Sequence, residues 1–463
     1  MSRGQTPTTR NGIGVGRPGL GHSETARQLV HMSMAAFALL LRWIPWWGAV
    51  LLAVTAVLFN IFLLPAAAPA LFRTGDHRRT LHGIVFYPLA VLALLLCFPR
   101  RLDIAASAWG ILAFGDGAAT LAGRAFDGPR WPWNREKTLT GTAAFVVAGS
   151  AAAVFLAWWC GARAVDQPAW LRVAAVPIAA CIAAAYVETI PIRLDDNLSV
   201  ASAAGAALWL GSLIVPAAVP TALAVVRQSI PAAVVVNAIV AAAGYRARTV
   251  SRSGAIVGAI IGTGIVAAAG WRGWTLLLLT FAAASVSSRV GLRHKTLLGI
   301  AEARGGRRGA GNAIANTGVA LVSACLILLT RHPAAASLAF ATALAAGGSD
   351  TIASEVGKAW GRRTWSITSF ARVPAGTSGA MSLEGTAAGL LGALALGAAA
   401  AALGVVPSTS IGPVVVGATA GALLESYLGA TLEAPGILNN DVLNFINTAA
   451  AAAIAILVQG GAA

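Results

Sequence analysis

Carboxylates are the residues of this sequence whose types and positions point to chemistry. The chain has 463 residues, of which 57% are hydrophobic and only 17 are Asp or Glu. Twelve of these acids form two sets of six, one in each half of the chain, with no acid between Asp196 and Glu302. Because a carboxylate is costly in an apolar environment, a retained one indicates a functional site. The two sets are Asp116, Asp127, Glu136, Glu188, Asp195 and Asp196, and Asp350, Glu355, Glu384, Glu425, Glu433 and Asp441.

The two acid sets lie in sequence blocks that occur twice, in the same order. Asp116 and Asp350 each stand seven residues before a glycine that is followed by a basic residue. Four blocks match in this way, at separations of 234 to 244 residues, which is close to half the chain. The pattern predicts an internal duplication. The paired blocks are 115–124 and 349–358, 137–144 and 382–388, 188–189 and 425–426, and 195–197 and 439–441.

Asp116 and Asp350, the leading aspartates of the two halves, have neighbours that could bind a nucleotide and its metal ion. Asp116 precedes a Gly-rich basic loop that contains Arg124, Asn134 and Lys137. A carboxylate can hold Mg²⁺, while Lys and Arg neutralise charge on a transferring phosphoryl group. The alternative is that these cations only set the membrane topology. Only three of the 33 cations are lysines, and two of the three, Lys137 and Lys358, lie within the paired blocks, which favours the phosphate role.

A second acidic cluster follows the Asp116 block. It consists of Glu188, Asp195, Asp196 and Asn197. Three carboxylates within nine residues repel one another unless a cation bridges them, and a shared Mg²⁺ is the simplest bridge. The alternative is a solvated loop. Glu425, Asn440, Asp441 and Asn444 form the matching cluster in the second half, which favours the metal site in both.

The composition determines the elements that must position these residues. Charged residues make up 11% of the chain, against roughly 25% in a soluble domain, so a soluble fold is excluded. The net charge of +16 fits basic membrane loops, and no nucleic-acid partner is expected, because no basic stripe alternates with aromatic residues. We predict an all-α polytopic membrane protein with about 14–15 transmembrane helices in two parallel-repeated halves. The predicted spans are 30–46, 48–68, 81–98, 104–122, 138–159, 171–190, 198–216, 220–243, 254–270, 273–290, 311–330, 333–353, 382–403, 408–430 and 443–459.

The distribution of Lys and Arg predicts the orientation of these spans. The N-terminal segment and the loops after even-numbered spans contain 25 cations, whereas the other loops contain 7. This asymmetry places the N-terminus, the even loops and both Asp blocks on the cytoplasmic side of what we expect to be a bacterial inner membrane. Residues 1–22 are predicted to be a disordered tail, followed by two membrane domains, 23–215 and 216–463.

Two known families share motifs with the chain. Residues 23–215 resemble the CTP-using polyprenol kinases, which include dolichol kinase and phytol kinase. The second half is similar to the integral membrane family that includes phytyl-phosphate kinase. The first resemblance is carried by 24–31, 87–88, 115–124, 134–141 and 188–197, and the second by 253–255, 311–316, 349–358, 382–386, 425–430 and 440–444.

The resemblance implies two consecutive activities. The first half would phosphorylate an isoprenoid alcohol such as phytol or geranylgeraniol, and the second would convert the monophosphate to the diphosphate. CTP would be the phosphate donor and Mg²⁺ the cofactor, with the lipid held between Ala/Gly-rich helices. No general base is evident, so positioning and charge neutralisation would drive the transfer.

The predicted site residues have three roles. The catalytic residues are Asp116, Lys137, Asp350, Glu355 and Lys358. Nucleotide and phosphate binding is assigned to Gly123, Arg124, Asn134, Thr138, Gly141, Asn312, Asn316, Gly357, Arg362, Gly376, Gly379 and Gly385. Metal binding is assigned to Asp116, Glu188, Asp195, Asp196, Asn197, Asp350, Glu425, Asn440 and Asp441.

Two other functions remain open. One is a cytidylyltransferase of the CDP-diacylglycerol synthase type, whose acidic and basic motifs are similar. The other is a secondary transporter with duplicated halves, in which intramembrane acids would relay protons. The nucleotide, the length of the isoprenoid chain and the oligomeric state are not determined by the sequence.

Overall fold

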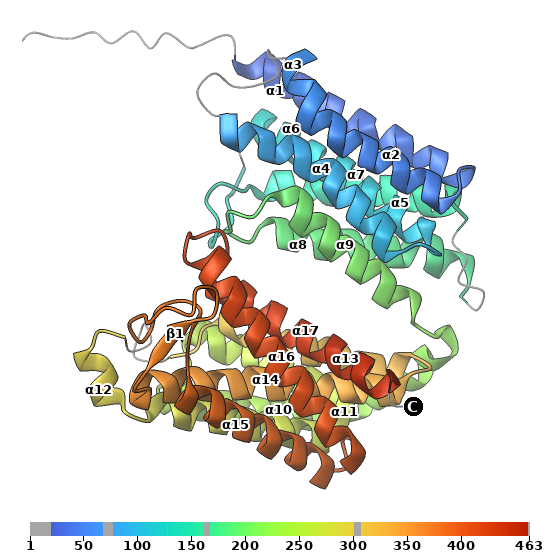
Figure 1. The fold of residues 1–463 in the computed structure, drawn as a ribbon. Helices are drawn as coiled ribbons and strands as arrows, with labels where there is room; N and C mark the ends of the chain where they lie inside the picture. Colours follow the sequence, from blue (N-terminus) through green and yellow to red (C-terminus); the bar gives the residue numbers. More distant parts are fainter. Residues whose placement is uncertain (1–19, 68–76, 127, 162–166, 301–306, 462–463) are drawn as a thin grey trace, which may run out of the picture. The chain divides into compact units, whose positions relative to one another are not determined.

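The computed structural model describes residues 20–67, 77–126, 128–161, 167–300 and 307–461. The predicted disordered tail, 1–22, lies almost entirely outside this range, and its last three residues already belong to the first helix. The chain divides into two compact units (Figure 1). The first extends to Gly211, except for 166–168 and 192–194, which belong with Ser212–Ala463 in the second. The division falls four residues before the predicted boundary at 215.

The first unit consists of helices. Its longest α-helices, α4 and α7, have 21 residues each. In chain order the segments are α1 (Leu20–Ser33), the 3₁₀-helix η1 (Met34–Arg42), α2 (Trp46–Leu58), the π-helix η2 (Phe59–Leu63), α3 (Leu64–Ala67), α4 (His77–Cys97), α5 (Leu102–Gly110), the π-helix η4 (Ile111–Gly115), α6 (Asp116–Ala125), α7 (Leu139–Trp159), the π-helix η5 (Leu171–Ala175), α8 (Val176–Glu188) and α9 (Asp196–Ser212).

The second unit is also helical, with one two-stranded antiparallel sheet. Its segments are the 3₁₀-helix η6 (Pro216–Ala218), α10 (Val219–Arg246), α11 (Arg252–Arg289), α12 (Leu292–Leu297), α13 (Ala310–Leu329), α14 (Pro333–Trp360), β1 (Thr364–Ser366), β2 (Ala380–Ser382), α15 (Leu383–Ala402), the 3₁₀-helix η8 (Ser408–Ser410), α16 (Ile411–Leu428), the π-helix η9 (Gly429–Glu433) and α17 (Asn440–Gly461).

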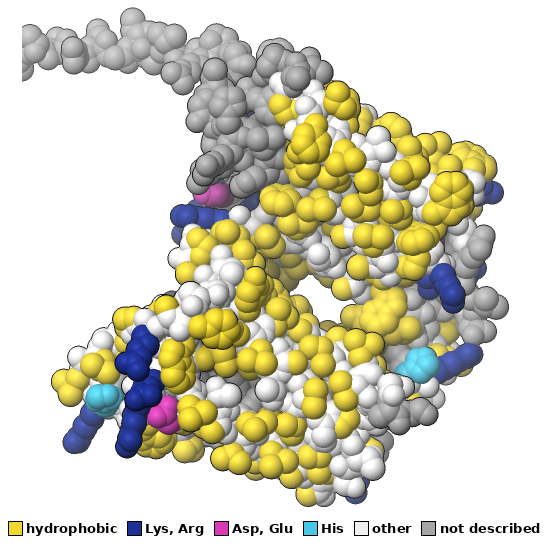
Figure 2. Space-filling model, viewed as in Figure 1, with side chains coloured by type: hydrophobic (Ala, Val, Ile, Leu, Met, Phe, Trp, Pro, Cys, Tyr) yellow, Lys and Arg dark blue, Asp and Glu magenta, His cyan; other side chains and the backbone are white. Residues whose placement is uncertain are grey.

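The all-α membrane class predicted from the composition is confirmed. Ten helices among the described residues are long and apolar enough to cross a membrane. Figure 2 shows hydrophobic side chains over much of the described surface in view, as expected for a surface that faces lipid. Ten is fewer than the 14–15 predicted spans, because some of those segments are short or carry charges. The apolar part of α4 has 14 residues (Ile84–Cys97), and α14 contains two acids and a lysine.

Gly270 separates two of the predicted spans. Helix α11 has 38 residues, but its backbone is not helical at Gly270, so it consists of two helical arms that meet at a kink. Gly270 has φ 68° and ψ −174°, a conformation that only glycine adopts readily, and it divides α11 into two arms. The arms correspond to the predicted spans 254–270 and 273–290.

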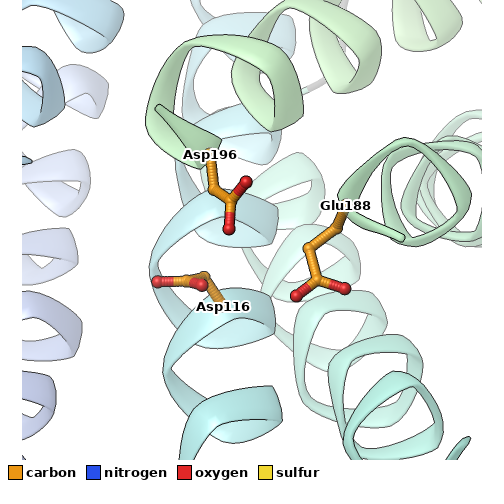
Figure 3. Close-up of side chains that lie close together, drawn as sticks. All are labelled: Asp116, Glu188 and Asp196. Atoms are coloured by element: carbon orange, nitrogen blue, oxygen red, sulfur yellow. The ribbon is translucent and has the colours of Figure 1, made fainter. Parts of the chain in front are cut away.

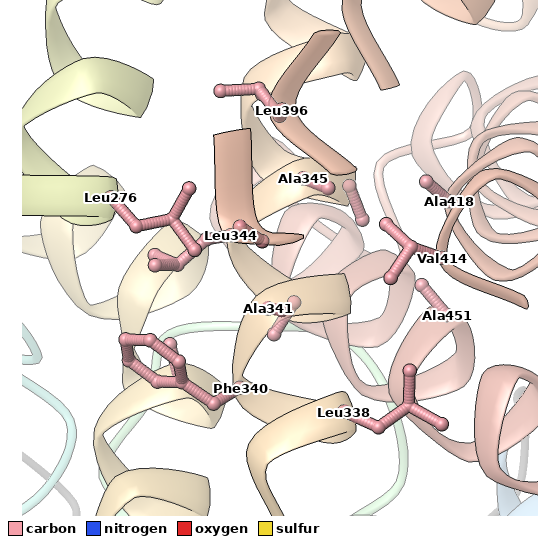
Figure 4. Close-up of a cluster of buried hydrophobic side chains, with 14 of the residues drawn as sticks. Leu276, Leu338, Phe340, Ala341, Leu344, Ala345, Leu396, Val414, Ala418 and Ala451 are labelled. Atoms are coloured by element: carbon pink, nitrogen blue, oxygen red, sulfur yellow. The ribbon is translucent and has the colours of Figure 1, made fainter. Parts of the chain in front are cut away.

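The helix that carries the leading aspartate is central in its unit. In the first unit, 72% of the Leu102–Ala125 segment is buried, against 11% of Trp46–Leu63. In the second unit, α14 contacts α11, α13, α15, α16 and α17. Figure 4 shows the core around it, in which Phe340 and Leu344 of α14 pack with Leu276 of α11. Alanine is the commonest residue of this core, and small side chains let helices approach closely in a membrane.

Hydroxyl caps begin the helices that follow these central helices. The Oγ1 of Thr138 accepts a hydrogen bond from the Gly141 amide at 3.0 Å, at the start of α7. The Oγ of Ser382 accepts one from the Gly385 amide at 3.1 Å, at the start of α15. Each cap satisfies an amide that the helix itself leaves without a partner. Thr138, Gly141 and Gly385 were predicted to bind phosphate, and in the structure they take part in these caps.

Candidate functional site

Three carboxylates meet in the first unit. One oxygen atom each from Asp116, Glu188 and Asp196 lies within 4.8 Å of the other two. Figure 3 shows that the three side chains come from three separate helices. Glu188 is buried, and the other two are partly buried. Three of the acids predicted to bind metal are therefore in one place, although 80 residues separate Asp116 from Asp196.

Helix ends place these three side chains. Asp116 directly follows the π-helical turn Ile111–Gly115, which changes the direction of the next side chains within a continuous helix. Glu188 is the last residue of α8, and Asp196 is the first residue of α9. The loop 189–195 joins α8 to α9, so these two acids lie at its two ends.

Lys137 supplies a cation to the cluster. Its Nζ forms an ion pair with Glu188 and lies 2.9 Å from Oδ2 of Asp196. Burial of Lys137 opposes its charged form, but the carboxylates of Asp196 and Glu188 outweigh this effect and raise its pKa. The lysine therefore stays protonated at any physiological pH. The sequence predicted Mg²⁺ as the bridge between these acids, whereas the structure shows an ammonium group between two of them.

Aromatic residues anchor the loop that carries Lys137. Trp133 donates its Nε1 hydrogen to Oγ1 of Thr189 at 3.2 Å, and Nδ2 of Asn134 donates to the Thr189 carbonyl at 3.1 Å. Trp131 stacks on Trp133 with the ring centroids 4.6 Å apart. Thr189 directly follows Glu188, so these bonds place Lys137 against that glutamate. Asn134, predicted to bind phosphate, thus positions the loop.

His31 is a neighbour of Asp116 that the sequence analysis did not select. Its Nε2 is buried, has no hydrogen-bond partner, and lies 3.9 Å from Oδ2 of Asp116. The imidazole packs on Tyr87, whose hydroxyl accepts a hydrogen bond from Trp109 at 2.7 Å. A buried imidazole nitrogen beside a carboxylate is a candidate to accept the proton of a bound alcohol. The only signal in the sequence was the position of His31 at the end of a resembling segment.

The other predicted residues of the first half lie on the helices that carry the cluster or pack against them. Oδ1 of Asp195 accepts hydrogen bonds from the amide and the side chain of Asn197 at 3.0 and 2.7 Å, which stabilises the first turn of α9. Gly123 packs against α7, where an added Cβ would lie 3.2 Å from the hydroxyl of Thr138. Arg124 is in the last turn of α6.

A polar cavity occupies the second unit. Helices α13, α14, α15, α16 and α17 contribute to its walls, together with the segment between β1 and β2. Gly376 and Gly379 of that segment have φ values of 87° and 74°, which favour glycine over other residues. Nine predicted site residues line the cavity: Asn312, Asp350, Gly357, Lys358, Gly376, Gly379, Gly385, Glu425 and Asn440.

Two acids in this cavity lie in direct contact. The carboxyl groups of Asp350 and Glu425 are within hydrogen-bonding distance. Oε2 of Glu425 also accepts a hydrogen bond from Nδ2 of Asn447 at 2.6 Å. Glu433 lines the cavity as well, and it is in the acid set of the second half. Asn447 was not predicted, since it lies one turn beyond the repeated block.

Glu355 has a different position from that predicted. It is 1% exposed and forms an ion pair with Lys295, which is itself fully buried. The Nζ of Lys358 lies 3.3 Å from the other oxygen of Glu355. Of these three residues, only Lys358 lines the cavity. The third lysine of the chain, Lys295, thus has a structural partner that sequence spacing did not reveal.

Three further predicted residues lie outside the polar cavity. Asn316 lines an adjoining apolar cavity instead. Arg362 donates its backbone amide to Oε1 of Glu384 at 3.3 Å. Asp441 packs against Gly311 of α13, where its carboxylate occupies the space that a Cβ would need.

The donor sets of the two units differ in how they fit a divalent cation. Carboxylate oxygens are the ligands that Mg²⁺ prefers, and it usually takes one or two from the protein and the rest from phosphate and water. In the first unit Lys137 already binds Oε1 of Glu188 and Oδ2 of Asp196, which leaves Asp116 and the second oxygens of Glu188 and Asp196. In the second unit Asp350 and Glu425 offer two carboxylates in the cavity wall. Both sets suit a metal ion that also binds a nucleotide.

Known proteins resemble parts of the chain. The family model described as Integral membrane protein DUF92 matches residues 235–452. The protein named Protein VTE6, chloroplastic, of Arabidopsis thaliana is 37% identical over 194 residues, which are 40% of this chain and 58% of that protein. Uncharacterized membrane protein sll0875 of Synechocystis sp. is 39% identical over 200 residues, 41% of this chain and 75% of that protein.

A relative with a kinase name covers less of the chain. Probable phytol kinase 3, chloroplastic, of Glycine max is 30% identical over 137 residues, 29% of this chain and 43% of that protein. The chain therefore spans about half the length of this relative and of Protein VTE6. No solved structure matches the chain.

Proposed function

The chain belongs to the integral membrane protein family DUF92, and from this premise we propose that it phosphorylates isoprenoid lipids in two consecutive steps. The first unit would transfer the γ-phosphate of CTP to an isoprenoid alcohol such as phytol or geranylgeraniol. The second unit would transfer another γ-phosphate to the resulting monophosphate. The kinase name of a relative of this chain supports the class of reaction.

The observation that carries the proposal is the cluster of Asp116, Glu188, Asp196 and Lys137. It combines carboxylates that can bind a metal ion with a cation that can neutralise phosphate, at one end of apolar helices. Phosphoryl transfer needs this combination, because positioning and charge neutralisation provide most of its catalysis. The cavity with Asp350, Glu425 and Lys358 supports a similar role for the second unit.

In the first transfer, the hydroxyl oxygen of the alcohol attacks the γ-phosphorus of CTP. The bond from that phosphorus to the bridging oxygen breaks, and CDP leaves. The hydroxyl proton passes to a base, for which His31 Nε2 beside Asp116 is the candidate. In the second transfer a phosphate oxygen of the monophosphate attacks in the same way and needs no base at neutral pH.

Asp116 and Asp196 would hold Mg²⁺ in the first unit, and Asp350 and Glu425 would hold it in the second. The ion would shield the charge of the nucleotide phosphates. Lys137 and Lys358 would bind the phosphoryl oxygens, with Arg124 nearby in the first unit. The Gly376–Gly379 segment borders the second cavity and would direct backbone amides toward an anion.

We also propose that the two units arose by duplication, with both sites facing the cytoplasm of a bacterial cell. Matched packing supports the duplication. An added Cβ at Gly123 would lie 3.2 Å from the Thr138 hydroxyl, and one at Gly357 would lie 3.1 Å from the Ser382 hydroxyl. Each of these hydroxyls caps the helix after the Asp helix.

Purified full-length protein with CTP, Mg²⁺ and phytol or geranylgeraniol tests the proposal. We expect transfer of label from γ-labelled CTP to the lipid, and no transfer from α-labelled CTP. Transfer of the α-label would instead identify a cytidylyltransferase. Absence of both, with nucleotide-independent uptake into proteoliposomes, would overturn the kinase proposal in favour of a transporter.

A further inference from the structure

An apolar cavity adjoins the polar cavity of the second unit. Its walls come from the C-terminal part of α10, both arms of α11 and the first turns of α13. Apolar residues such as Val240, Leu277 and Phe281 face it. The few polar groups include Asn237, whose Oδ1 accepts a hydrogen bond from Trp274 Nε1 at 3.0 Å. That bond satisfies the amide oxygen, so the cavity offers little to a polar ligand.

The two cavities share part of their walls. Arg308 and Asn312 line both of them. From this shared wall, the apolar cavity extends along α13 from Gly309 to Thr317, a length of about 12 Å at the helical rise. Along the first arm of α11 it extends from Gly254 to Ile261, about 10 Å. A ligand with a phosphate end and a hydrocarbon end could therefore place each end in the matching environment.

We propose that this apolar cavity binds the prenyl tail of the isoprenyl monophosphate, with the phosphate beyond Asn312 in the polar cavity. The inference rests on the proposed function of the second unit and specifies how its lipid substrate is held. The tail gains its affinity from burial of hydrocarbon, and the part beyond the cavity stays in the bilayer.

Gly258 is a position at which a substitution can fill this cavity. It lies in the wall on the first arm of α11, and an added Cβ would meet no heavy atom within 4 Å. A larger side chain there would project into the cavity without displacing protein atoms. Gly412, on α16, is also exposed and equally free of neighbours, but it lines neither cavity. It is therefore a matched control for a substitution in an exposed helical glycine.

The test uses purified full-length protein with CTP, Mg²⁺ and two acceptors, geranylgeranyl monophosphate and the much shorter dimethylallyl monophosphate. In Gly258→Leu we expect the KM for the long acceptor to rise about tenfold, as for the loss of roughly two buried methylene groups. The kcat/KM for the short acceptor should stay within about twofold of wild type. Gly412→Leu should behave as wild type with both acceptors.

A benzophenone-bearing analogue of geranylgeranyl monophosphate provides a second measurement that does not depend on turnover. In the wild-type protein it should label peptides of α11 and α13. Equal KM values in wild type and Gly258→Leu, or labelling confined to other helices, would overturn the tail site while leaving the kinase proposal intact. Labelling of α11 and α13 without turnover of either acceptor would overturn the kinase activity of this unit and keep the lipid site. If Gly258→Leu does not fold, the labelling pattern of the wild-type protein tests the tail site by itself.

Discussion

The two units combine a similar order of helices with different polar contacts. In the first unit, Asp116, Glu188 and Asp196 surround one lysine, and two of the three carboxylates bind it directly. In the second unit, Lys358 aligns with Arg124 rather than with Lys137, and it contacts Glu355. Asp350 and Glu425 contact each other in the wall of an open cavity. The first cluster is compact, whereas the second is part of a large space.

The difference teaches that repeated sequence blocks need not give repeated contacts. The packing glycines and hydroxyl caps are matched, because they depend only on neighbouring helices. The ion pairs differ, because Lys295 on α12 occupies Glu355 and has no counterpart in the repeated blocks. The larger cavity suits the second step of the proposed pathway, whose acceptor already carries a phosphate.

The largest expected effect is a difference in the lipid products that accumulate when the leading aspartate of one unit or the other is substituted. Asp116→Asn should reduce formation of both products from the alcohol about 10³-fold, because charge stabilisation by the metal ion is lost. Asp350→Asn should leave the first step unchanged and cause the monophosphate to accumulate. Mass analysis of the lipid products measures both. If the Asp350→Asn protein converts the alcohol to the diphosphate at the wild-type rate, the second cavity is not the site of the second phosphorylation.

Substitutions of the two lysines beside Glu355 should have opposite consequences. Lys295→Met leaves a buried carboxylate without its main partner and should destabilise the protein by about 3–5 kcal/mol. Lys358→Met removes a partly exposed partner, so it should change stability little and lower the rate of the second step instead. Thermal unfolding in detergent and a monophosphate kinase assay measure the two effects. Equal destabilisation by both would contradict the structural role of Lys295.

Lys137 offers a sharper test of the compact cluster. Lys137→Met should lower the rate of the first step about 100-fold, because the phosphoryl group loses its cation. The Mg²⁺ concentration for half-maximal activity should fall, since the lysine no longer competes for Asp196 and Glu188. A titration with Mg²⁺ measures both parameters. A higher Mg²⁺ requirement would indicate that Lys137 assists metal binding rather than competing with it.

The smallest effects are expected at the matched caps. Thr138→Ala and Ser382→Ala should each destabilise the protein by about 1 kcal/mol, the usual cost of a lost helix cap. Similar shifts in thermal unfolding would strengthen the correspondence of α7 and α15. An effect at only one of the two would show that the packing around the caps differs despite the shared sequence.

Much of the fold was predictable from the sequence. An apolar chain with few charges must bury its backbone in helices, so the all-α membrane class follows from composition alone. The spans 138–159 and 311–330 were predicted within a residue of α7 and α13, because a charged or Gly-rich loop borders each of them. The sequence also marks four residues as site candidates: Asp116, Lys137, Glu188 and Asp196.

Other features were not predictable because they depend on partners distant in the chain. His31 approaches Asp116 from a helix 85 residues earlier, and nothing in its own segment indicates that contact. Glu355 was predicted to be a catalytic residue together with Asp350, yet five residues along a helix place the two side chains on different faces. Lys295 lies outside the repeat altogether, so the duplication could not reveal it.

The sequence by itself determined which residues could do phosphate chemistry, because in so apolar a chain each carboxylate and lysine needs a compensating partner or a function. Only the tertiary structure decided which of them share a site. Helix packing brings α6, α8 and α9 together around Lys137 and leaves two adjoining cavities among α10 to α17. Packing of side chains along whole helices sets these distances, and the order of residues within one segment cannot encode them.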